Sequence, residues 1–267
     1  MRRMRPVAFV VLTAALIFAA GDEATLHLRT RVELFKGSGD WRTTTLDYGI
    51  EPRKTAIILC DLWDKHWCRG SSGRVDQLAP RVAAVVAKLR AKGILVIHAP
   101  SETMDFYKDS PNRKAAQAIP KATPPVELIL DSPKLPIDDS GGGCETKDKV
   151  YKAWTREHPS IPVEPADLVS DKGDEVYSAL KLRGIETLLV AGVHTNFCIL
   201  NRTFAIKQMT KWGVKTILIR DLTDSMYDPD DRPRVTHERG TELVIEHIEK
   251  YWAPTITSPE LLRAVGR

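Results

Sequence analysis

Short, unbroken runs of apolar residues alternate along the chain with stretches of helical periodicity. Ala56 to Cys60 and Ile94 to Ile97 are continuous apolar runs, which is typical of strands buried on both faces of a sheet. Between them, Leu78 to Lys92 has apolar residues at helical spacing and ends before Gly93, a suitable helix stop. This alternation predicts an α/β fold.

The second half of the chain repeats the pattern. Its predicted elements are strand Asp167 to Val169, helix Glu175 to Arg183, strand Thr187 to Ala191, a helix from about Phe197 to Trp212, strand Lys215 to Ile219, helix Val235 to Lys250 and edge strand Thr255 to Thr257. Repeated strand–helix–strand units predict a doubly wound, mostly parallel sheet with helices on both faces, a Rossmann-type three-layer architecture.

Residues 21–54 follow a different pattern. Leu26 and Leu28 alternate with His27 and Arg29, which predicts a half-buried strand, and a Gly-Ser-Gly turn follows. We interpret this segment as an N-terminal β extension of the main domain.

Residues 99–165 are rich in proline, contain the triple glycine 141–143 and have weak periodicity. We interpret them as a long, lid-like insertion with a short helix or two. The main domain is then expected at 55–257, with 258–267 as a C-terminal tail.

The first twenty residues have the features of a signal peptide. Arg2, Arg3 and Arg5 precede Val7 to Ala20, an apolar stretch too short to span a bilayer as a helix. We expect cleavage and export, to the periplasm or the medium. An uncleaved anchor or a wrongly assigned start is the alternative.

Composition and charge exclude several classes of partner. The chain has 267 residues, of which 43% are hydrophobic and 28% charged, as in soluble globular proteins. Removal of the leading segment, with its three arginines, lowers the formal net charge from +4 to +1. We therefore expect a small-molecule substrate, with no nucleic-acid partner and no membrane contact by the mature form. Oligomers are usual in families of this fold, so a homo-oligomer stays open.

Two reactive residues follow predicted central strands. Asp61 comes directly after one strand, and Cys198 follows the loop after another. Because the carboxyl ends of parallel strands meet at one edge, we expect the two side chains to converge. Cys198 also opens a predicted helix, a position that favours a thiolate, and an Asp nearby can accept its proton. Alternatively, Asp61 caps a turn and Cys198 is a small buried hydrophobe.

These residues belong to longer motifs. Val190 to Cys198 reads Val-Ala-Gly-Val-His-Thr-Asn-Phe-Cys, Asp61 ends an apolar strand, and Lys172-Gly173 precedes Tyr-Ser-Ala-Leu at 177–180. Over about residues 53–251 the chain resembles the isochorismatase-like cysteine hydrolases, which include nicotinamidases and N-carbamoyl amidohydrolases.

The resemblance implies a catalytic triad of Asp61, Lys172 and Cys198. It also implies a cis peptide bond between Val193 and His194 and an oxyanion hole made by the backbone N–H groups of His194 and Cys198. The alternative for Lys172 is a plain surface lysine. The implied reaction is hydrolysis of a C–N bond, amide or carbamoyl, through a thioester on Cys198. A metal-assisted amidase of the same superfamily and a non-catalytic, small-molecule-binding relative are the alternatives.

The substrate pocket is predicted from residues that follow the strands. We expect Trp63, His66, Trp67 and His98 to bind substrate, although the tryptophans fit equally well as packing under the insertion. The resemblance implies no cofactor, and the Asp-x-His metal motif of nicotinamidases is missing. A metal site from His66, His98 and Asp64 has a spacing that fits no standard pattern, so we predict none.

The four cysteines separate by position. Cys60 lies in a buried strand and Cys198 is the expected nucleophile, which leaves Cys68 and Cys144 in loops. In the oxidising compartment expected for an exported protein, these two are predicted to form a disulfide. A thioredoxin-like role is disfavoured because the chain has no Cys-x-x-Cys motif.

Overall fold

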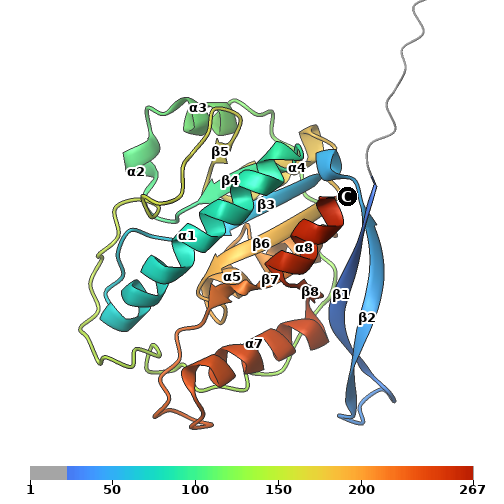
Figure 1. Ribbon diagram of the computed structural model, residues 1–267, viewed down its shortest axis with the longest axis vertical. Coiled ribbons are helices and arrows are strands. Elements are labelled where there is room, and N and C mark those ends of the chain that lie inside the picture. Colours follow the sequence, from blue (N-terminus) through green and yellow to red (C-terminus); the bar gives the residue numbers. More distant parts are fainter. Residues whose placement is uncertain (1–22, 267) are drawn as a thin grey trace, which may run out of the picture.

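The computed structural model describes residues 23–266 (Figure 1). The expected signal peptide lies outside the described residues. Within the described range, the helices lack the combination of length and apolar character that a membrane span requires.

One eight-stranded sheet organises the chain, in the order β2-β1-β8-β7-β6-β3-β4-β5. From β8 to β5 neighbouring strands are parallel, whereas β1 is antiparallel to both β2 and β8. The strands are β1 (Ala24–Glu33), β2 (Trp41–Ile50), β3 (Thr55–Cys60), β4 (Leu95–Ala99), β5 (Leu168–Val169), β6 (Thr187–Val193), β7 (Lys215–Asp224) and β8 (Thr255–Ile256). The predicted mostly parallel sheet is confirmed.

Helices pack on both faces of this sheet. They are α1 (Arg69–Ala91), α2 (Met104–Tyr107), α3 (Pro111–Gln117), α4 (Gly173–Leu182), α5 (Cys198–Asn201), α6 (Ile206–Lys211), α7 (His237–Tyr251) and α8 (Ser258–Val265), with a 3₁₀ turn at Pro52–Lys54. Helices α1 and α8 cover the face that carries Ile57 and Leu59, and they lie across the near side of the sheet in Figure 1. Helices α4, α6 and α7 pack on the opposite face, which carries Ala56 and Ile58. The alternation of Cβ directions along β3 thus produces two apolar cores, one on each side.

The N-terminal extension is a hairpin, β1 and β2, at one side of the sheet (Figure 1). Leu26 and Leu28 are buried and His27 is exposed, as the alternation predicts. The alternation weakens after Leu28 because Arg29 and Arg31 are half-buried, with their side chains bonded to Glu249 of α7.

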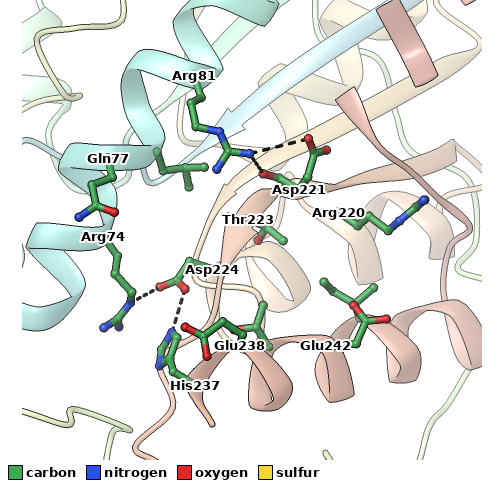
Figure 2. A pocket seen from close by; sticks show the side chains of 13 residues that line it. Arg74, Gln77, Arg81, Arg220, Asp221, Thr223, Asp224, His237, Glu238 and Glu242 are labelled. Carbon is green, nitrogen blue, oxygen red and sulfur yellow. Dashed lines mark hydrogen bonds and ion pairs between the residues drawn. The ribbon is translucent and has the colours of Figure 1, made fainter. Parts of the chain in front are cut away.

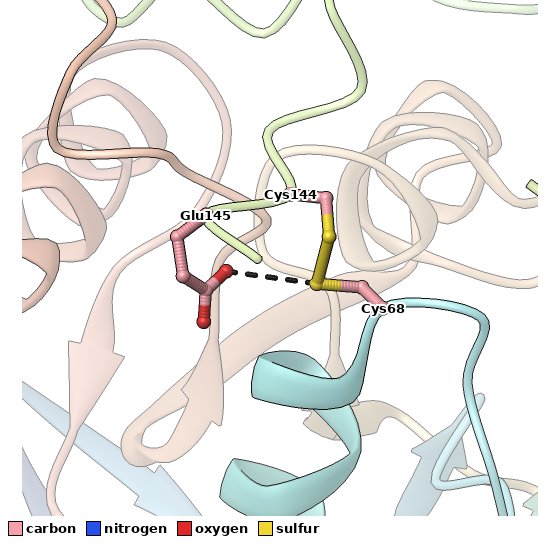
Figure 3. A group of neighbouring side chains, drawn as sticks. All are labelled: Cys68, Cys144 and Glu145. Carbon is pink, nitrogen blue, oxygen red and sulfur yellow. Dashed lines mark hydrogen bonds between the residues drawn. A yellow bond between two sulfur atoms is a disulfide. The ribbon is translucent and has the colours of Figure 1, made fainter. Parts of the chain in front are cut away.

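The insertion has two short helices, α2 and α3, and is otherwise irregular. Backbone hydrogen bonds hold it to the domain at intervals, including Leu128 N–H to the carbonyl of Lys211 and Asp138 N–H to that of Arg232. A disulfide joins Cys144 to Cys68 at the start of α1, as Figure 3 shows. The predicted pairing of these two cysteines is therefore present.

Four boundaries differ from the sequence-based prediction. The helix expected over about 197–212 is two helices, because the Asn201 side chain bonds the backbone carbonyls of Asn196 and Phe197 and the chain turns extended at Arg202. Strand β7 continues to Asp224 because it pairs with the end of β6.

The expected C-terminal tail contains a helix, α8. A capping box between Thr257 and Glu260 starts it, and Leu261 anchors it in the core beside α1. Helix α1 also begins earlier than predicted, at Arg69. Its first turns bury only scattered residues, so the sequence shows no clear apolar period from which this start could be predicted.

Replacing both cysteines of the disulfide, in Cys68→Ser/Cys144→Ser, is expected to lower the free energy of unfolding by about 4 kcal/mol. The bridge closes a loop of 76 residues, and opening it restores chain entropy to the unfolded state. Urea denaturation of the oxidised protein and of the double variant measures this difference. Reduced wild-type protein should unfold at the same urea concentration as the double variant. If the double variant instead unfolds at the same urea concentration as the oxidised wild type, the prediction is wrong.

Candidate active site

The ends of β3 and β6 lie side by side and bring Asp61 next to the loop that carries Cys198. Cys60 pairs with Gly192 in the parallel register, so the residues that follow each strand emerge at one edge. Gly192 has φ +123°, and a Cβ there would lie 2.0 Å from the carbonyl oxygen of Cys60. Only glycine fits this close approach. The predicted convergence of the two strand ends is therefore observed.

Asp61 is fully buried and adopts a left-handed backbone conformation, with φ +51°. Its Oδ1 accepts a hydrogen bond of 2.7 Å from the N–H of Ser101, and its Oδ2 accepts one of 2.9 Å from Nε of Arg202. Burial raises the pKa of this carboxyl, and the Arg202 charge opposes that rise. The result is an ionisable acid with little access to water.

The Cys198 thiol faces the Asp61 carboxylate. Burial and then the negative charge of Asp61 raise the pKa of this thiol, whereas the nearby Arg202 charge lowers it. The expectation of a thiolate stabilised by a helix start is wrong in this respect. Helix α5 has only four residues, so its dipole is too small to offset burial beside a carboxylate.

His194 directs its backbone at this pair. The peptide bond between Val193 and His194 is cis. The backbone N–H of His194 lies near the Cys198 sulfur and lowers the pKa of its thiol, and the His194 carbonyl accepts hydrogen bonds from the N–H groups of Phe197 and Ile199. Its imidazole points the other way and is bonded to Ser71 of α1.

Arg202, and not Lys172, supplies the cation in contact with Asp61. Lys172 is exposed at the start of α4, and in the described part of the chain it has no ion pair with Asp61. Gly173 packs against the Thr203 backbone, and the chain leaves α5 in an extended conformation at Arg202, whose guanidinium reaches the buried Asp61. Arg202 follows Cys198 by four residues, one helical turn, and that spacing was the available signal.

Aromatic rings close the site. Trp154, from the insertion, stacks on Trp63 at 4.5 Å and on His66 at 5.7 Å between ring centroids. Trp63 and His66, as predicted from sequence, line a narrow crevice beside Asp61 that holds about 170 Å³ of empty space. The crevice is smaller than most ligand sites, so these rings must move to admit a substrate.

Two predicted pocket residues lie elsewhere. His98 is fully buried, with Nδ1 2.6 Å from Glu157 and Nε2 3.1 Å from Asp167, so neither nitrogen is free for a substrate or a metal. Its position at the end of β4 suggested a pocket, but the insertion folds over that strand end. Trp67 packs against the disulfide and not in the crevice.

The described residues offer one group with metal-ligand geometry, formed by Cys68, Cys144 and Glu145 (Figure 3). Both thiols are consumed by the disulfide, and a Glu145 carboxylate oxygen lies 3.6 Å from the Cys68 sulfur. This group is therefore not an argument for a metal. The combination of His66, His98 and Asp64 is not brought together.

A separate pocket of about 380 Å³ lies between α1, β7 and α7 (Figure 2). Its charges are already paired: Asp224 accepts from Nε of Arg74 at 2.8 Å and lies 2.8 Å from Nε2 of His237, while Arg81 donates to Asp221. Because the charged groups satisfy one another, this pocket offers less chemistry than the edge that carries Asp61 and Cys198.

Comparison with known proteins agrees with the fold. The isochorismatase domain family matches residues 55–259. A cysteine hydrolase from Pseudomonas syringae pv. phaseolicola 1448A has a TM-score of 0.53 at 15% identity, covering 81% of this chain and 94% of its own. An isochorismatase family protein from Burkholderia thailandensis has a TM-score of 0.48 at 13% identity, covering 80% and 97%. The first likeness shows a shared fold. No curated protein matches the chain.

His98 is expected to make stability depend on pH. Glu157 and Asp167 raise the pKa of His98 to about 9 despite burial, against 6.5 when exposed. The folded chain thus keeps a proton that the unfolded chain loses, so the stabilisation is complete below pH 6.5 and is lost as the pH rises through 9. The difference in free energy of unfolding between wild type and His98→Gln should narrow from pH 6 to pH 9.5. The control is His27→Gln, since His27 forms an exposed pair with Asp47. If the difference in free energy of unfolding between wild type and His98→Gln is the same at pH 6 and pH 9.5, the prediction is wrong.

Proposed function

The chain belongs to the isochorismatase family, and on this premise we propose that it is an exported cysteine hydrolase that cleaves an amide or carbamoyl C–N bond of a small molecule. The observation that carries the proposal is the pairing of the buried Asp61 carboxylate with the half-buried Cys198, with Arg202 bonded to the same carboxylate. A nucleophile, a proton acceptor and a fixed positive charge meet at one point, as covalent catalysis requires.

In the proposed first step, Asp61 accepts the Cys198 proton and the sulfur attacks the substrate carbonyl carbon. The negative charge that forms on the carbonyl oxygen is held by the backbone N–H groups of His194 and Cys198. The C–N bond then breaks, and Asp61 returns the proton to the departing amine. The product of this step is a thioester on Cys198.

In the second step, Asp61 accepts a proton from water while the water oxygen attacks the thioester. The C–S bond breaks, the sulfur takes the proton back, and the acyl group leaves as an acid. The same carboxylate serves in both directions because its burial, which raises the pKa, is opposed by Arg202. Arg202 keeps its own proton throughout and acts only as a charge and hydrogen-bond donor.

Trp63 and His66 are proposed to contact the substrate, with Trp154 stacked over them as a cover. Displacing this cover opens the crevice, and its return excludes water while the C–N bond breaks. Burial lowers the pKa of His66 to about 4, so its ring is neutral and suits a hydrogen bond rather than an ion pair with substrate.

The proposal of export is supported by the disulfide. Structural disulfides persist in oxidising compartments, and this one joins a buried helix start to the insertion.

A panel of small primary amides and N-carbamoyl compounds tests the function, with ammonia release as the measurement. We expect turnover by wild type and losses of about 1,000-fold or more for Cys198→Ala and Asp61→Asn. Asp61→Asn should at the same time shift alkylation of Cys198 by iodoacetamide to lower pH, since the Asp61 charge raises the pKa of the thiol. An alkylation profile unchanged by Asp61→Asn would contradict the proposed pair.

Arg202→Met should act in the opposite direction on the thiol. Loss of the Arg202 charge raises the pKa of Cys198 further, so alkylation shifts to higher pH and turnover falls by about 100-fold. The matched control is Lys172→Met, which removes an exposed cation of the same edge and should change turnover by less than about twofold. If Lys172→Met instead loses most of its turnover and Arg202→Met loses little, Lys172 is the catalytic cation, as the resemblance implies, and Arg202 is not.

A further inference from the structure

A hydrogen bond of 2.6 Å joins the Ser71 hydroxyl of α1 to Nε2 of His194. Ser71 is fully buried and His194 is 2% exposed. The bond crosses 123 positions of sequence and connects the first turn of a helix to the loop that ends β6. The mechanism above uses only the backbone of His194, so it leaves this buried side chain without a role.

The His194 imidazole is an uncharged group. Burial lowers its pKa to about 3, and the neighbouring His66 contributes in the same direction. A neutral ring has one donor and one acceptor nitrogen, and Ser71 occupies Nε2. The His66 ring meets it edge-on at 4.9 Å, which limits rotation of the imidazole from a second side.

Ser71 itself is held from several directions. The residue that precedes α1, Cys68, is tied to Cys144 by the disulfide. The N–H of Arg69 donates to Asp148 of the insertion at 2.9 Å. Immediately after Ser71, the Ser72 side chain is bonded to the backbone of His66. The hydroxyl of Ser71 is thus a fixed point relative to the domain.

We propose that Ser71 is a positioning residue: by holding the His194 imidazole it keeps the backbone N–H of His194 directed at the place where the oxyanion forms. The inference rests on the proposed function. The backbone carbonyl of His194 is already fixed by the start of α5, so anchoring the side chain leaves the residue little freedom to turn. Pre-aligned donors of this kind stabilise a transition state without reorganisation.

Two reactions of Cys198 separate this role from a general structural one. Acylation by p-nitrophenyl acetate forms a C–S bond, breaks the ester C–O bond and passes through an oxyanion on the carbonyl oxygen. Alkylation by iodoacetamide displaces iodide at a saturated carbon and forms no such oxyanion. A misdirected His194 N–H therefore slows acylation alone. The measurements are p-nitrophenolate release in a single turnover and alkylation of Cys198 followed by peptide mass spectrometry.

Ser71→Ala is expected to slow acylation of Cys198 by about tenfold to 100-fold and to leave its alkylation rate unchanged. Ser178→Ala is the matched control. Like Ser71, Ser178 is a buried, hydrogen-bonded serine in a helix, but it lies in α4, outside the site, and its hydroxyl is bonded to backbone groups. It should leave both rates unchanged.

Equal acylation rates in wild type and Ser71→Ala would overturn this inference alone. A parallel fall of both rates in Ser71→Ala would also overturn it, since Ser71 would then support the nucleophile or the fold rather than the amide. A wild-type chain that p-nitrophenyl acetate does not acylate at Cys198 would overturn the proposed function, and this inference with it.

Discussion

The carboxylate of Asp61 has no exposed surface, so its charge is stabilised by protein groups in place of water. The N–H of Ser101, the guanidinium of Arg202 and the thiol of Cys198 provide this stabilisation from three different segments. Each segment must be placed by a different part of the fold: the start of the insertion, the break after α5 and the loop after β6. The geometry of the site therefore depends on the sheet edge, where the parallel pairing of β3 with β6 brings Asp61 and the Cys198 loop together.

The loop that carries Cys198 is fixed by elements far from it in sequence. Helix α1 holds His194 through Ser71, and the Asn196 side chain donates to Asp139 of the insertion and to the backbone of Met226. The disulfide connects the first of these supports to the second, because it links the start of α1 to the insertion close to Asp139. Short-range forces alone do not hold such a loop, since α5 has only four residues and little stability of its own.

Most of the fold was accessible from local patterns. Buried strands such as β3 and β6 are continuous apolar runs, and a parallel sheet with helices on both faces follows from their alternation with helices. Patterns failed where long-range packing replaced local preference. Strand β7 continues past its apolar run because β6 pairs with it, and α1 starts before its apolar period because the disulfide and Arg74 tie its first turns to the insertion.

The family resemblance gave the roles of acid and nucleophile to Asp61 and Cys198. The sequence by itself determined that both residues lie at one edge of the sheet, because each follows a predicted central strand. It did not determine which cation meets Asp61 or what His98 does. Lys172 and Arg202 are both basic residues near the right strands, and only the packing of the chain around Gly173 and the turn at Arg202 decided between them. The role of His98 was decided by two acidic residues remote in sequence, Glu157 of the insertion and Asp167 beside β5, which bond both of its ring nitrogens. Such contacts depend on the distance between side chains remote in sequence, a quantity that local periodicity does not contain.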